Sequence, residues 1–187
     1  MRILCFILIR VLVLAACVPA QAFCEGASLS SAQSIARTAA KKAAKKIGVA
    51  RPRYSAECIL AAVAWKKKIN LRGDVPLPSV RYGSETPAEE FNDAVEPQWG
   101  MRPDIVLNVY VFRLNRIYLL DDAAYYMKMG RFVDDSLAHE LTHYLQVKYQ
   151  GITEMDDSDE FEAVAVQTWF RETYMRDAVP AGAPACR

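Results

Sequence analysis

Histidine is scarce in this chain of 187 residues: there are only two, His139 and His143. A metal site built from three histidines is therefore excluded. Charge is nearly balanced, with a formal net charge of +1, so composition gives no support for a nucleic-acid-binding protein. With 52% hydrophobic residues the chain can bury one good core but has little room for two domains.

Acidic residues are missing from residues 1–22, which are largely apolar. The uninterrupted apolar stretch there is shorter than the roughly 20 residues that a membrane-spanning helix needs. We therefore predict a secretory signal that ends at the Ala-Gln-Ala of residues 20–22, and an exported protein, periplasmic or secreted. The alternative is a lipobox at residues 14–17, in which Cys17 becomes lipidated and a membrane becomes a partner.

No cysteine lies in a Cys-x-x-Cys motif, so a cysteine-based zinc site is not expected. After cleavage at residue 22 the chain keeps Cys24, Cys58 and Cys186. This odd number predicts one disulfide and one free or intermolecular thiol. Cys58 is expected to pair with Cys186 or with Cys24.

The rest of the chain divides into a basic, helical N-terminal region (residues 23–53), one domain (residues 54–178) and a C-terminal tail (residues 179–187). Hydrophobic periodicity and helix-end residues predict an α+β order of elements. The expected helices are 55–68, 87–95, about 135–149 and about 157–175, and the expected strands are 80–82, 105–112 and 116–120, with 125–131 ambiguous.

Both histidines fall in one pentapeptide, His-Glu-Leu-Thr-His, at residues 139–143. Residues at i and i+4 lie one above the other on a helix face, so His139 and His143 can converge on one cation. Glu140 is turned about 100° from His139, where it can reach a water molecule rather than the ion. This arrangement predicts a metal centre with Glu140 as a general base.

The third ligand is expected from a carboxylate on the following helix, either Glu160 or Glu162. Asp157 as N-cap would give Glu160 a structural role at the N3 position of a capping box. Glu162 precedes the apolar run 163–166, where a buried and unpaired carboxylate would be destabilising. We therefore predict Glu162, with Glu160 as the alternative.

From residue 117 to residue 169 the chain resembles the gluzincins, the thermolysin-like clan of zinc metallopeptidases. The motif carrying the resemblance is HELTHYLQ, followed by the Glu-Phe-Glu-Ala of residues 160–163. The resemblance implies a minimal zincin-like fold, a zinc ion held by His139, His143 and Glu162, and an edge strand at residues 116–120 that pairs with an extended peptide.

Two features depart from that clan. Val166 stands where an aspartate orients a zinc-bound histidine, so this support is expected from Gln167, Asp121 or Asp122. There is also no later histidine to stabilise an oxyanion, which leaves three tyrosines as candidates: Tyr144, Tyr149 and Tyr174.

The resulting hypothesis is a zinc metallopeptidase that acts on a peptide or protein substrate. One alternative is a zinc-binding envelope or assembly domain without turnover. Another is a helical envelope protein in which the motif is fortuitous. The oligomeric state and the substrate sequence are not predicted.

Overall fold

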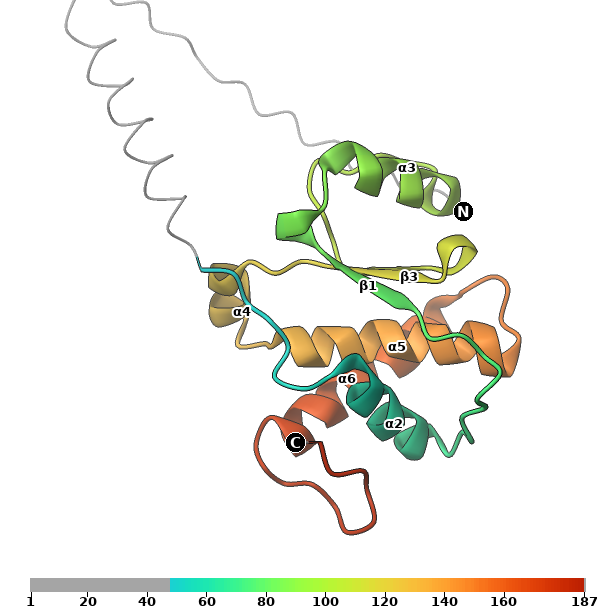
Figure 1. The fold of residues 1–187 in the computed structure, drawn as a ribbon, viewed down its shortest axis with the longest axis vertical. Coiled ribbons are helices and arrows are strands. Elements are labelled where there is room, and N and C mark those ends of the chain that lie inside the picture. Colours follow the sequence, from blue (N-terminus) through green and yellow to red (C-terminus); the bar gives the residue numbers. More distant parts are fainter. Residues whose placement is uncertain (1–47, 187) are drawn as a thin grey trace, which may run out of the picture. The chain divides into compact units, whose positions relative to one another are not determined.

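The computed structural model describes residues 48–186, in which five α-helices and a three-stranded sheet confirm the α+β class (Figure 1). The signal segment, Cys24 and the basic stretch up to residue 47 lie outside these residues. Within 48–186, no helix is long and apolar enough to cross a membrane. The elements are α2 (Ala56–Lys67), β1 (Ser79–Tyr82), α3 (Ala88–Trp99), β2 (Val109–Val111), β3 (Arg116–Leu119), α4 (Ala123–Met129), α5 (Val133–Gln150) and α6 (Asp157–Tyr174).

The sheet has the order β1-β3-β2, with β3 parallel to β1 and antiparallel to β2. The prediction that the strand at 116–120 forms the edge is therefore wrong, because β3 is paired on both sides. The edge next to α5 is β2. This strand is shorter than predicted: residues 105–108 have no partner strand, and residues 112–114 form a 3-10 turn before Asn115, which has a left-handed conformation with φ of 45°.

The sheet separates two apolar clusters, and the alternation of side chains along its strands explains both. Val109 and Val111 point to one face, where they pack with residues of α3 such as Phe91. Tyr110 between them, and Ile117 of β3, belong to the larger cluster with α2, α5 and α6. In Figure 1, α3 covers one face of the sheet and α5 runs beneath the other, with α2 and α6 beyond it.

The long helix α5 forms the floor of this arrangement. Its apolar positions 137, 141, 144 and 145 are each at most 1% exposed, so the helix is anchored on several sides. It ends at Gly151, where a φ of 76° favours glycine. The histidine motif therefore stands on a rigid helix rather than on a loop.

A disulfide joins Cys58 in α2 to Cys186 in the tail, which is one of the two predicted pairings. It closes a loop with a sequence separation of 128 residues. The tail is also held by the Tyr174 hydroxyl, which donates to the Pro184 carbonyl at 2.8 Å. The tail is therefore attached to the helical layer at two points.

We expect the double variant C58A/C186A to lose about 2–5 kcal/mol of unfolding free energy, because the crosslink no longer restricts the unfolded chain. Equilibrium denaturation in guanidinium chloride measures this loss. A reducing agent should lower the midpoint of the wild type but leave that of the variant unchanged. If the wild type and the variant had equal midpoints in the absence of a reducing agent, the expectation would be contradicted.

Candidate metal centre

The two histidines of α5 face each other across one helical turn. Their Nε2 atoms are 3.0 Å apart, and His143 is only 7% exposed. Burial, reinforced by the proximity of His143, lowers the pKa of His139 to about 3. Both side chains therefore present ring nitrogens to the same small volume, as the motif predicts.

Glu160, in the first turn of α6, completes the group. Its Oε1 lies 3.2 Å from His139 Nε2, and its Oε2 lies 3.2 Å from His143 Nε2. These three side chains could hold a metal ion.

The capping of α6 explains why Glu160 is free to do this. The predicted capping box is displaced by one residue: Asp156 is the N-cap, and the N3 residue that reaches back to its N–H is Asp159. The structural role assigned to Glu160 from the sequence therefore belongs to Asp159. With its own backbone N–H bonded to the Asp156 carbonyl, Glu160 keeps its carboxylate for the histidines.

Glu162, the ligand favoured from the sequence, is not part of this group of three side chains. Its carboxylate forms an ion pair with Lys67 and accepts a hydrogen bond from Gln146 Nε2 at 2.9 Å. The burial expected of this region does not hold, since the Glu162 side chain is 43% exposed and Val164 is 42% exposed. Glu162 therefore has partners without a metal ion.

Glu140 is beside the histidines but is held differently. It is 4% exposed, and burial raises the pKa of its carboxyl to about 8, although the Tyr110 backbone N–H opposes this rise. Tyr110 belongs to β2, so the edge strand lies directly against this carboxyl. The predicted grouping of His139, Glu140 and His143 is thus found in one place.

The support of the histidines differs from the prediction. Gln146 Oε1 lies 2.8 Å from His143 Nδ1. Asp121 bonds Arg51 and Ser84 instead, and Asp122 caps α4. Within residues 48–186, Gln167 makes no hydrogen bond to either histidine. The i, i+3 spacing of His143 and Gln146 on one helix was the available sequence signal for this contact.

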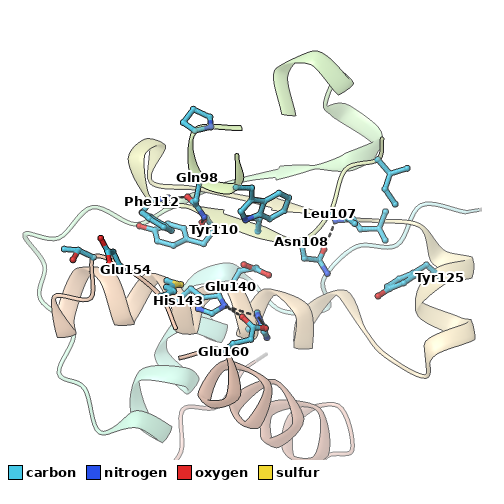
Figure 2. A pocket seen from close by; sticks show the side chains of 18 residues that line it. Gln98, Leu107, Asn108, Tyr110, Phe112, Tyr125, Glu140, His143, Glu154 and Glu160 are labelled. Carbon is cyan, nitrogen blue, oxygen red and sulfur yellow. Dashed lines mark hydrogen bonds and ion pairs between the residues drawn. The ribbon is translucent and has the colours of Figure 1, made fainter. Parts of the chain in front are cut away.

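A cleft of about 900 Å³ opens above these residues. In Figure 2, Glu140, His143 and Glu160 lie on one wall, and Gln98, Tyr110 and Phe112 lie opposite. None of the described residues that line the cleft is a lysine or an arginine.

The tyrosines of the cleft are not the predicted ones. The hydroxyls of Tyr144 and Tyr174 bond the carbonyls of Pro76 and Pro184, and none of the three predicted tyrosines lines the cleft. The cleft instead contains Tyr110 and Tyr125.

The free edge of β2 carries backbone groups that face the cleft. The side-chain amide of Gln98 bonds two of them: its Nε2 donates to the Tyr110 carbonyl at 3.1 Å, and its Oε1 accepts from the Phe112 N–H at 3.3 Å. This C=O and N–H pair is the kind of pair that a neighbouring strand would engage. Gln98 thus occupies a strand-pairing position beside the candidate metal centre.

Searches against models of protein families, against curated proteins and against solved structures found no significant match for this chain. The function is therefore inferred from the geometry of the centre and the chemistry of its side chains.

Proposed function

We propose that the chain is a zinc-dependent metallopeptidase with a minimal zincin-like fold, related in its site design to the gluzincins. The observation that carries the proposal is the convergence of His139, His143 and Glu160, with Glu140 on the same turn of α5. This convergence brings a carboxylate of α6 to the two histidines of α5, which a pentapeptide present by chance would not require. Glu160 takes the ligand position for which the sequence favoured Glu162.

The donor set fits zinc. Two imidazole nitrogens and one carboxylate are a typical protein ligand set for a catalytic zinc ion, which keeps a further position open. Atoms that each lie ~2.0–2.1 Å from a tetrahedral zinc ion are about 3.3 Å from one another. The two histidine nitrogens here are 3.0 Å apart, and each lies 3.2 Å from a different oxygen of Glu160, so the three groups already stand close to that spacing.

The bound ion would polarise a peptide carbonyl and lower the pKa of a water molecule. The chain supplies the rest. A bound cation would also lower the pKa of the buried Glu140 carboxyl on the same helical turn, so that Glu140 would be a carboxylate able to take a proton from the water and deliver it to the leaving amine. The side chain is only 4% exposed and bonds the Tyr110 backbone N–H of β2, so few water molecules can reach it. The corresponding reaction class is hydrolysis of an amide bond.

The substrate we propose is the interior of a peptide chain. An extended peptide can pair with the free edge of β2 by β-addition, which aligns its backbone along the cleft. A free carboxyl terminus is disfavoured, because the described residues of the lining include no lysine or arginine to bind it and do include three glutamates, Glu140, Glu154 and Glu160.

Replacing Gln98 with alanine should lower KM for peptides up to about tenfold, because the substrate then engages β2 without displacing two hydrogen bonds. We expect kcat to change much less. Steady-state hydrolysis of internally quenched peptides separates the two parameters. Gln150→Ala, at the far end of α5, is the control, and a raised KM in Gln98→Ala would exclude pairing at this position.

Metal removal tests the proposal as a whole. We expect about one zinc per purified chain by elemental mass spectrometry, loss of peptide hydrolysis after chelation, and recovery on adding zinc. Zinc without hydrolysis of any peptide would favour the alternative of a zinc-binding envelope or assembly domain. No zinc, even after reconstitution, would exclude both.

Export through the signal at residues 1–22, with Cys17 lipidation as the alternative, remains part of the proposal.

A further inference from the structure

A line of polar contacts runs outward from His143 through three helices. His143 Nδ1 lies 2.8 Å from Gln146 Oε1 in α5. Gln146 Nε2 donates to Glu162 Oε2 at 2.9 Å and to the Asp159 carbonyl at 3.0 Å, both in α6. Glu162 is paired in turn with Lys67, at the end of α2.

The Gln146 amide has only one satisfactory orientation. Its nitrogen faces two acceptors, so its oxygen must face the imidazole. That oxygen accepts only, so His143 must carry a proton on Nδ1, which leaves Nε2 as the nitrogen directed at Glu160. Gln146 is fully buried, so a reversed amide would set its oxygen against the Glu162 carboxylate without a proton between them.

Lys67 explains why Glu162 holds its place although the carboxylate is half exposed. The Lys67 side chain is only 3% exposed, and among the described residues its Nζ has no hydrogen-bond partner beyond this ion pair. A buried ammonium group is strongly destabilising without a counter-charge, so Lys67 and Glu162 hold each other. The carboxylate is thereby fixed where Gln146 needs it.

The other histidine has no such support. His139 Nδ1 is buried and bonds no group in the part of the chain that the structure describes. The two histidines of the centre are therefore oriented differently, one by a chain of contacts and one by packing alone.

We propose that Gln146 is a positioning residue which, held by Glu162 and Lys67, keeps His143 as the Nδ1–H tautomer with Nε2 directed at the metal position. This inference rests on the proposed metal site and adds to it a link between α2 and metal affinity. The ion pair of Lys67 with Glu162 is the contact through which α2 takes part in this link.

The test reads the tautomer of each histidine by long-range proton–nitrogen NMR on the purified zinc-free protein. The chain has only two histidines, so His139→Asn assigns both sets of signals. We expect His143 to show the Nδ1–H form in the wild type and to lose that preference in Gln146→Met. Gln167→Met also removes a buried amide, from α6, and should leave the His143 signals unchanged.

Zinc affinity is the second readout. Gln146→Met should weaken it about 10–100-fold, the usual effect of losing a partner of a metal-bound histidine. Lys67→Met should weaken zinc affinity less than Gln146→Met but more than Gln167→Met. If Gln146→Met fails to fold, Lys67→Met still tests the proposal.

Unchanged His143 signals in Gln146→Met would overturn the proposal, and an unchanged affinity in Lys67→Met would overturn the link to α2. A wild type with the Nδ1–H form but no zinc affinity would overturn the metallopeptidase proposal while leaving the tautomer assignment intact.

Discussion

Glu140→Gln is expected to lower kcat for peptide hydrolysis by about 10²–10⁴-fold, the usual contribution of a general acid or base. The amide keeps the shape of the side chain but cannot take a proton at working pH. Zinc content should stay at the wild-type level, because Glu140 is not among the three converging ligand groups. Stopped assays of peptide cleavage, with metal analysis of the same samples, measure both quantities.

Glu154→Gln is the matched control for this substitution. Glu154 lines the same cleft and is exposed, so the variant removes an equal charge without touching the proton-transfer group. It should retain most of the wild-type kcat. If Glu140→Gln cleaved peptides at the normal rate, the proposed role of Glu140 would be wrong, whatever the zinc content.

Glu160→Ala should raise the dissociation constant for zinc by more than about 100-fold, which exceeds the 10–100-fold loss typical of outer partners. The reason is that both Glu160 oxygens lie 3.2 Å from histidine nitrogens. Competition with a chromophoric chelator measures the constant. Glu154→Ala should leave it nearly unchanged, because that side chain is absent from the converging group.

Glu162→Ala, measured beside Glu160→Ala, discriminates between the two candidate ligands. We expect a smaller loss for Glu162→Ala, because its carboxylate acts through Gln146. The reverse order would mean that Glu162 is the ligand, as the sequence favoured, and that α6 rearranges when the metal binds.

The helical part of the fold was largely predictable. The helices α2, α5 and α6 were predicted to within about two residues, because each has apolar residues at helical spacing and recognisable end residues such as Ser55 and Gly151. The strand at residues 105–112 was predicted too long. Its side chains favour a strand, but residues 105–108 have no partner strand, so composition alone could not set its start.

The position of β3 at the centre of the sheet could not be predicted for a similar reason. Periodicity identifies a strand but not its neighbours, and the parallel pairing of β1 with β3 crosses over α3 and β2 in the sequence. The Gln98 contact with β2 could not be predicted either, because it depends on how α3 packs beside the sheet.

The candidate site was predictable wherever one helix carries it. His139, Glu140 and His143 are placed by the geometry of a single turn. The choice between Glu160 and Glu162 depended on the start of α6, and a shift of the N-cap from Asp157 to Asp156 reassigned the role of Glu160. The burial expected near Glu162 was also mistaken, because the packing of α6 leaves Val164 at the surface.

The position of α2 in the fold sets an order of assembly during synthesis. Its packing partners are α5 and α6, Lys67 pairs with Glu162, and Cys58 bonds a residue in the tail. A ribosome makes α2 long before any of these partners, so the helix has no stable place to dock while the chain is growing. The support of His143 can therefore form only after most of the chain has been made, and a nascent chain that ends before α6 lacks Glu160, one of the three groups that could hold a metal ion.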